Sequence, residues 1–270
     1  MKMNRNLYKK ELKRNRKNLI IWTSIVLVFT ILVLSIFPYM KNIGDQMAKM
    51  MSELPEGMTM AMGIDAQTFN SILGMYNTYY GIYIVVLLSI YAASTAAIIL
   101  SKEERDKTAE FLLTKPISRK EIFVSKFFVL FTLVSIAYLV QTIIAVVFIT
   151  MFGGDDMMWP VFITMHTHGL ILILFFTCVC LFISMLLKPK KSYMGLTVGI
   201  VFGSYFLDKI AKATDVMDWI GYISPFRYLN FSVSDPNYGV HIIAVFLSLL
   251  VSIILIILSN KLYSKKDIAT

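Results

Sequence analysis

Four groups of side chains in this sequence could do chemistry. They are the carboxylate pair Glu103-Glu104, the histidine pair His166 and His168, the cysteine pair Cys178 and Cys180, and a set of methionines. Paired carboxylates can act as general acid and base, imidazoles and thiolates bind transition metals, and thioethers bind Cu(I). The methionines are Met47, Met50, Met51, Met58, Met60 and Met62.

None of these four groups has the full residue pattern that would identify its site. An E-E-x-x-x-R protease motif would need arginine where this chain has Thr108. The His and Cys pairs are spaced i, i+2, so on a helix they do not share a face, and only an irregular segment at His166 would bring both imidazoles together. Methionine more often fills adaptable apolar surfaces than binds copper. We therefore expect no catalytic, cofactor-binding or metal-binding residue, with the His and Met sites left open.

The composition is that of a membrane protein. Hydrophobic residues make up 57% of the 270 residues and charged residues only 16%, and the mean hydropathy is +0.69. A soluble domain is nearer 45–50% apolar and about 25% charged. These values exclude both a soluble enzyme and a disordered chain. The two cysteines lie in one apolar run, so no disulfide framework is available.

Six apolar runs are long enough to cross a bilayer as helices, and none shows the alternation of a barrel strand. The chain is expected to be an all-α membrane protein with six transmembrane helices, in one transmembrane domain covering 1–270. The first run is expected to be a retained signal anchor, and the fifth thins out at Asp208. The predicted spans are 19–40, 79–100, 127–152, 161–187, 193–213 and 238–259.

The distribution of basic residues predicts the orientation. Of the 26 Lys and Arg residues, 21 lie in the N-terminal arm, the second and fourth connections and the C-terminal tail. Basic residues accumulate on the cytoplasmic side. Both termini are therefore expected in the cytoplasm of a multi-pass protein of the cell membrane. The net charge of +9 reflects this bias and is not read as nucleic-acid binding.

The connection between the second and third spans, residues 101–126, is the most informative one. It carries an apolar cluster, Phe111, Leu112 and Leu113, among many charges. Pro116 should end a short helix there, and Ser118 with Glu121 has the spacing of a capping box that starts the next one. The cluster indicates a docking surface for another protein; the alternative is a solvated loop that lies on lipid headgroups.

This connection resembles the cytoplasmic loop of ABC-2 type permeases, whose pattern is a Glu pair, Gly/Lys-Thr, Leu-Leu, Pro and Arg. Lys107 stands where glycine is usual. Ser224-Pro225-Phe226 and the basic arm before the first span are also similar to that family. The resemblance implies that the loop is a coupling helix fitting a groove of an ATP-binding cassette subunit. The implied coupling residues are Glu103, Glu104, Thr108, Phe111, Leu112, Leu113, Pro116 and Arg119.

Two absences agree with this reading. The chain has no G-x-x-x-x-G-K-[ST] phosphate loop, so it is not expected to be an enzyme, and ATP should be bound by a partner subunit. No charged residue lies in the central turns of a span, where ion-coupled carriers usually place one. The chain is expected to act as the permease subunit of an ATP-driven exporter. The sequence does not identify the transported substrate. The alternative is a membrane scaffold or sensor without transport.

Two further patterns concern packing. Gly195, Gly199 and Gly203 form a small-residue stripe that lets helices approach closely, either within one subunit or against a second permease subunit, identical or related. In the N-terminal arm, Leu7, Tyr8 and Leu12 share one face, as in an amphipathic helix at the bilayer surface.

The charge distribution makes a direct prediction. Single cysteines placed at Glu56 and Asp155 should react with a membrane-impermeant thiol reagent in intact cells, whereas a cysteine at Lys190 should not. Labelling only at position 190 would reverse the orientation.

Overall fold

The computed structural model describes residues 3–55, 57–59, 71–106, 108, 117–153, 158–187, 193–231 and 238–265, and these are helices joined by turns, without a β-strand. Six helical segments are long and apolar enough to cross a membrane, which confirms the expected fold class. They are α1 (Arg5–Asn42), α4–η1–α5 (Ile72–Tyr79, Tyr80–Val85, Val86–Ile99), α8 (Arg119–Gly153), α9 (Trp159–Leu186), α10 (Met194–Ala213) and α13 (Ile242–Lys265).

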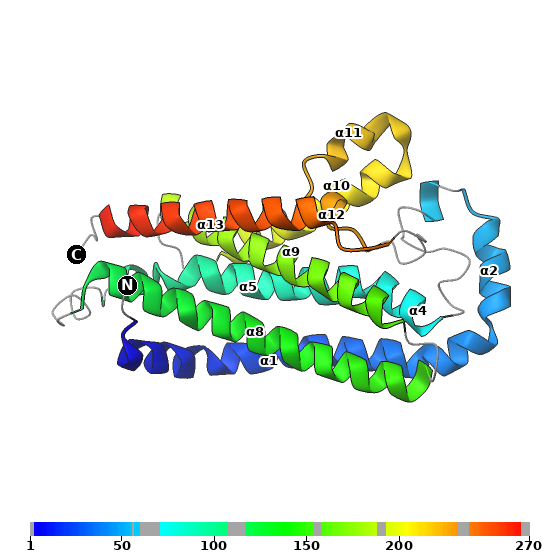
Figure 1. The fold of residues 1–270 in the computed structure, drawn as a ribbon, viewed down its shortest axis with the longest axis horizontal. Coiled ribbons are helices and arrows are strands. Elements are labelled where there is room, and N and C mark those ends of the chain that lie inside the picture. Colours follow the sequence, from blue (N-terminus) through cyan, green and yellow to red (C-terminus); the bar gives the residue numbers. More distant parts are fainter. Residues whose placement is uncertain are drawn as a thin grey trace.

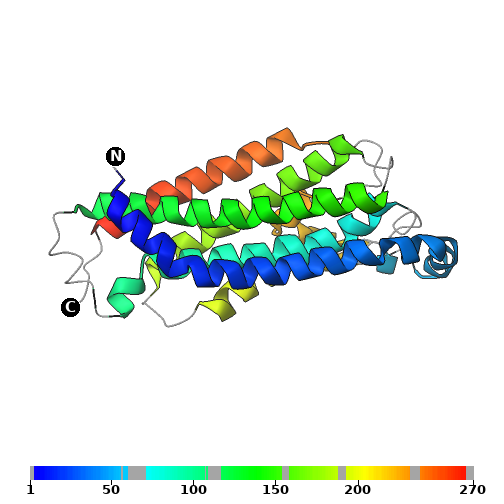
Figure 2. The same cartoon turned by 90° about the horizontal axis from the view of Figure 1, so that it is seen from below.

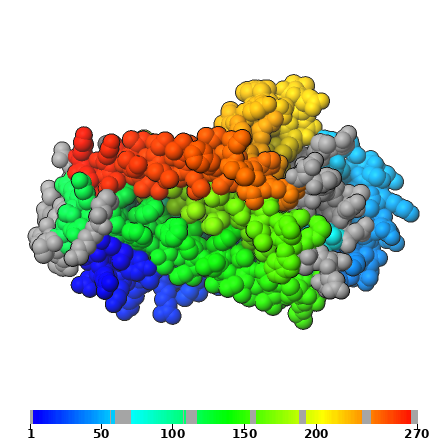
Figure 3. All heavy atoms as spheres, in the orientation of Figure 1, coloured from blue at the N-terminus to red at the C-terminus, as the bar shows by residue number. Residues whose placement is uncertain are grey.

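The helices run along the long axis of the molecule (Figure 1). The start of α1, the short α6 (Lys102–Arg105), the start of α8 and the end of α13 lie at one end, which we call the basic end. The opposite end, with α2 (Gly44–Ser52) and α4, is the far end. The segment α10–α11 projects sideways from the bundle, and α13 lies on its surface (Figure 3). Exposed apolar side chains cover the outward faces of α1, α8 and α13, as expected of helices surrounded by lipid.

The N-terminal arm and the first span form one continuous helix, α1, which runs beside α8 (Figure 2). Leu7 is buried, and the Tyr8 hydroxyl hydrogen-bonds to Thr132 Oγ1 at 2.9 Å. The apolar face of the arm therefore packs against protein.

The start of α8 has the predicted capping box. The Ser118 backbone N–H donates to Glu121 Oε2 at 2.9 Å, and the Glu121 N–H donates to Ser118 Oγ at 3.2 Å. Because these bonds satisfy N–H groups that a helix leaves unpaired at its first turn, α8 begins at Arg119, next to the end of the connecting loop.

Helix α5 is the centre of the bundle. Every residue from Leu88 to Ala97 is buried, and the helix packs mainly on α9, α10 and α8. Small residues such as Ala92 and Ala96 allow these neighbours to approach its backbone.

Toward the far end, buried polar side chains join α4, η1, α8 and α9. Gln141 Nε2 donates to the Tyr76 hydroxyl at 2.7 Å, the Tyr80 and Tyr138 hydroxyls are 2.9 Å apart, and Tyr138 donates to the His166 carbonyl. Polar groups buried without partners are costly, so these bonds hold the four elements in one register.

The aromatic segment before the last span folds back on α10 as η3 (Asp215–Met217), α11 (Asp218–Gly221) and α12 (Pro225–Tyr228). The Ser224 hydroxyl donates to the Ser204 carbonyl at 2.6 Å and caps α12, with Pro225 at its first position. Phe226 is buried, whereas Trp219 and Tyr222 are exposed.

The glycine stripe of α10 faces open space as far as the described residues go. A Cβ atom added at Gly195, Gly199 or Gly203 would meet no atom of the described residues within 4 Å. Among the described residues, no second helix approaches these glycines, and their contact with a second subunit stays a prediction.

One buried glycine does carry a tight contact. A Cβ at Gly169 would clash with the Tyr80 hydroxyl and lie 3.0 Å from two ring carbons, and that hydroxyl is held by Tyr138. We expect Gly169→Ala to lower the free energy of unfolding by about 1–3 kcal/mol, the usual cost of overpacking. Gly199→Ala is the matched control and should leave the stability of the single chain unchanged or slightly higher, because alanine favours helix. Unfolding of the purified variants in mixed detergent micelles measures both. Equal stability of the two variants would contradict the packing at Gly169.

Candidate coupling site and crevice at the basic end

A buried ion pair fixes the loop between α5 and α8. Lys126 of α8 is fully buried; its ammonium donates to the carboxylate of Glu103 on α6 and, at 2.6 Å, to the carbonyl of Ile99 at the end of α5. An ammonium in such surroundings keeps its charge only if it is paired and hydrogen-bonded. The pair therefore holds the start of the loop against the helix that follows it.

A second buried pair joins α6 to the N-terminal helix. Lys102 Nζ lies 3.1 Å from Glu11 Oε2, and Glu11 is 1% exposed. Burial lowers the pKa of Lys102, and the Glu11 carboxylate opposes that shift. Through these two pairs, one turn of helix is tied to both α1 and α8.

A third contact lies at the surface. The carboxylate of Asp106 accepts from Arg105 at 2.8 Å and from Arg14 of α1 at 2.9 Å. The hydrogen bond from Arg105 lowers the pKa of Asp106, and Arg14 lowers it further. Exposed ion pairs contribute little to stability, so this contact mainly links Arg14 of α1 to Arg105 of α6 through one carboxylate.

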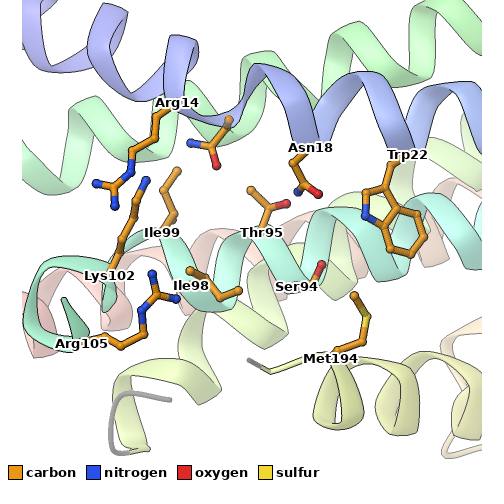
Figure 4. Close-up of a pocket in the computed structure, with 11 residues that line it drawn as sticks. Arg14, Asn18, Trp22, Ser94, Thr95, Ile98, Ile99, Lys102, Arg105 and Met194 are labelled. Atoms are coloured by element: carbon orange, nitrogen blue, oxygen red, sulfur yellow. The ribbon is translucent and has the colours of Figure 1, made fainter. Parts of the chain in front are cut away.

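Between α1 and α5 lies a crevice of about 310 Å³, bordered on one side by Met194 at the start of α10 (Figure 4). Arg14, Lys102 and Arg105 gather at one end of it, and Trp22 lies at the other. Asn, Ser, Thr and Ile side chains occupy the middle. The remaining lining residues are Asn15, Asn18, Ser94, Thr95, Ile98 and Ile99.

The structure places some of the predicted coupling residues and not others. Glu103 is buried in its ion pair, Glu104 is half-buried, and the Thr108 N–H donates to the Glu103 carbonyl at 2.9 Å. Arg119 is the first residue of α8. The remaining predicted residues, Phe111, Leu112, Leu113 and Pro116, lie outside the described residues.

The candidate metal ligands are not brought together. His166 hydrogen-bonds to the Phe162 carbonyl at 3.0 Å, whereas His168 contacts the Asn230 carbonyl at 2.9 Å. Within the described ranges, no three His, Cys, Asp or Glu side chains gather as metal ligands would. The methionines of α2 are described, but Met60 and Met62 lie outside those ranges.

Sequence reasoning missed Glu11, Lys126 and the crevice. One signal was available: Glu11 is the only acidic residue among eight Lys and Arg in the N-terminal arm. A lone carboxylate in such surroundings is a candidate for a specific ion pair. Nothing in the sequence places Asn18 opposite Ser94.

The buried pair can be tested by removing its cation. Lys126→Met leaves the Glu103 carboxylate buried and unpaired, so the free energy of unfolding should fall by about 3–5 kcal/mol. Lys120→Met, on the exposed face of the same helix, should change it by less than about 1 kcal/mol. Equilibrium unfolding in mixed micelles gives both values. Adding Glu103→Gln to Lys126→Met should recover much of the loss; no recovery would mean that Lys126 acts through packing alone.

The comparison with protein families agrees with this architecture. A family model described as ABC-2 family transporter protein matches residues 5–268, from the start of α1 to beyond the end of α13. Among curated proteins, none matches the chain significantly. The six helices and the match over nearly the whole length lead to one conclusion: this chain belongs to the ABC-2 family and is a multi-pass membrane permease component of an ABC transporter.

Proposed function

We propose that this chain is the membrane-spanning subunit of an exporter, driven by a separate ATP-binding cassette subunit that docks on the loop between α6 and α8. In this proposal the basic end faces the cytoplasm and the protein lies in the cell membrane. The positive-inside distribution of Lys and Arg supports the orientation. The family generally works with such an ATPase subunit.

The observation that carries the proposal is the attachment of α6. This turn follows α5 after only Leu100 and Ser101, and its Lys102 and Glu103 bind α1 and α8 through buried ion pairs. A solvated connector would not need buried ion pairs where it joins the bundle. A loop that transmits force from another subunit would need such ion pairs, because they attach it firmly to the neighbouring helices.

The same attachment gives a route for movement. When ATP closes two ATPase subunits, a push on the loop would reach α6 first and then α5, which is buried in the middle of the bundle. Because packed helices shift as rigid bodies, the displacement of α5 would be shared by α9 and α10, which pack against it. The path across the membrane would change there.

A second permease subunit completes the proposed assembly. The open face of Gly199 on α10 and the exposed side chains of Phe206 and Ile210 support a helix contact with another copy or a related chain. Two such subunits would enclose the path, with one ATPase subunit below each.

The docking loop is tested by Phe111→Ala. If Phe111 fills a groove on the ATPase subunit, truncation should remove about 2 kcal/mol or more of binding energy, which is about a thirtyfold loss of affinity. ATPase capture should be measured with the purified complex of the chain and its ATP-binding cassette subunit. Phe128→Ala, at an exposed position of α8, is the matched control and should bind normally.

Three results distinguish an ATPase-driven permease from a membrane scaffold or sensor. The chain alone should hydrolyse no ATP, because it has no phosphate loop. Normal capture and transport by Phe111→Ala would reduce the loop to a connector. Failure to recover any ATPase with the wild-type chain would favour a scaffold or sensor.

A further inference from the structure

The first turns of α1 carry a surface made of Lys and Arg side chains, which we call the cationic face. Its side chains are exposed, and because a helix turns about 100° per residue, they fall within an arc of about 140°. The buried residues of the same turns, Leu7 and Glu11, lie outside that arc. The members of the cationic face are Arg5, Lys9, Lys10, Lys13, Arg16 and Lys17.

The described part of the chain supplies no counter-charge for the cationic face. Its side chains form no ion pair or hydrogen bond with another described residue. Two carboxylates at this end are already occupied, because Glu11 is buried against Lys102, and Asp106 binds both Arg14 and Arg105. Arg14 is therefore not counted in the cationic face. A concentration of uncompensated charge of one sign attracts partners of the other sign.

The cationic face continues directly into a surface that lipid covers. Residues spaced three or four apart share one face of a helix, and such a stripe of exposed residues runs along α1 from Lys13 and Lys17 into the membrane span. After Lys17 its side chains are aliphatic. They are Ile21, Ile25, Val28 and Leu32. The change from lysine to isoleucine marks the edge of the hydrocarbon layer, so the lysines lie at the level of the lipid head groups.

The packing of the arm on α8 gives the same depth. The Tyr8 hydroxyl lies 2.9 Å from Thr132 Oγ1, so this turn of α1 is level with Thr132 and lies beside α8 (Figure 2). Phe128 and Phe131, within one turn of Thr132, are exposed, as expected of side chains in contact with lipid. The arm therefore lies beside a lipid-facing surface and does not project away from the membrane.

We propose that the cationic face binds the head groups of anionic lipids in the leaflet that surrounds the basic end. Clusters of Lys and Arg next to a membrane span attract such lipids electrostatically. Lipid is favoured over an acidic protein as the partner because the same face of α1 is lipid-covered from Ile21 onward. The proposal does not rest on the proposed function, since it needs neither an ATPase subunit nor transport.

Binding can be measured with a tryptophan placed on the stripe. Ile21→Trp introduces an indole one turn after Lys17, in a full-length chain whose native tryptophans, Trp22, Trp159 and Trp219, are replaced by phenylalanine. The protein is placed in phosphatidylcholine nanodiscs that contain a small fraction of lipid with brominated acyl chains, which quench indole fluorescence on contact. The brominated lipid is phosphatidylglycerol in one arm and phosphatidylcholine in the other.

We expect brominated phosphatidylglycerol to quench this indole at a mole fraction lower by about fivefold or more than brominated phosphatidylcholine. Lys13→Gln with Lys17→Gln should remove most of that preference, because the charges nearest the reporter are lost. Equal quenching by the two lipids before these substitutions would overturn the proposal.

A matched control separates a local site from the overall charge of this end. Lys261→Gln with Lys265→Gln removes two exposed lysines with the same spacing, from the end of α13, which runs along the opposite edge of the bundle (Figure 1). The preference at the α1 reporter should survive in this variant. An equal loss in both double variants would overturn the cationic face as the site.

Two further arms test whether charge at an exposed surface is the cause. Lys13→Arg with Lys17→Arg keeps both charges and should keep the preference, so a loss in this variant would overturn the electrostatic assignment. Raising the salt concentration from about 0.05 M to about 0.5 M should weaken the preference, because exposed charges are screened. A preference that does not change with salt would place the lipid in a buried site and overturn the proposal.

These measurements use the chain without its ATPase subunit, so the lipid proposal and the proposed function can fail separately. A clear preference for phosphatidylglycerol in a chain that captures no ATPase would overturn the proposed function only. The competing occupant is an acidic surface of the ATPase subunit. If Lys13→Gln with Lys17→Gln keeps the lipid preference but loses ATPase capture, the cationic face serves that protein and the lipid proposal is overturned.

Discussion

The basic end of this protein is arranged around one buried ammonium group, that of Lys126. Removing a charge from water is expensive unless an opposite charge and hydrogen bonds replace the water, and here the replacements are the Glu103 carboxylate and the Ile99 carbonyl. Both acceptors lie where α5 passes into α6, while the lysine lies on α8. The ion pair therefore closes the chain into a loop whose two ends cannot separate without exposing or stranding a charge.

The crevice is a consequence of how α1 is held. Along its length α1 packs on α8, and at the basic end Glu11 ties it to Lys102. Neither attachment brings α1 onto the face of α5 that carries Ser94 and Thr95. Where two helices meet through apolar side chains they interdigitate and exclude space, but here amide, hydroxyl and guanidinium groups face one another across the gap.

Much of the fold could be predicted from the sequence because its determinants are local. The six spans follow from the lengths of apolar runs, and the start of α8 follows from Ser118 and Glu121, three residues apart. The ion pairs could not be predicted in this way, since Glu11 and Lys102 are 91 positions apart and meet only after α1 and α5 have packed. The glycine stripe that includes Gly199 shows a related limit of sequence analysis. The spacing of the glycines predicts that another helix can approach this face closely, but it does not show whether that helix belongs to the same chain. The coupling residues Phe111, Leu112, Leu113 and Pro116 come from a family resemblance, and they lie outside the described residues.

The two proposals meet in a single turn of helix. In α6, Glu103 is held by Lys126, while Lys102 of the same turn binds Glu11 in the segment of α1 that carries the cationic face. An ATPase subunit that displaces the loop would therefore also move the groups that bind anionic lipid. Linkage requires the effect to be reciprocal: if docking of the ATPase changes the affinity of the cationic face for anionic lipid by some factor, the lipid changes the affinity for the ATPase by the same factor. A bound lipid would thus report its presence to the ATPase through α6, with no need for a longer route across the bundle.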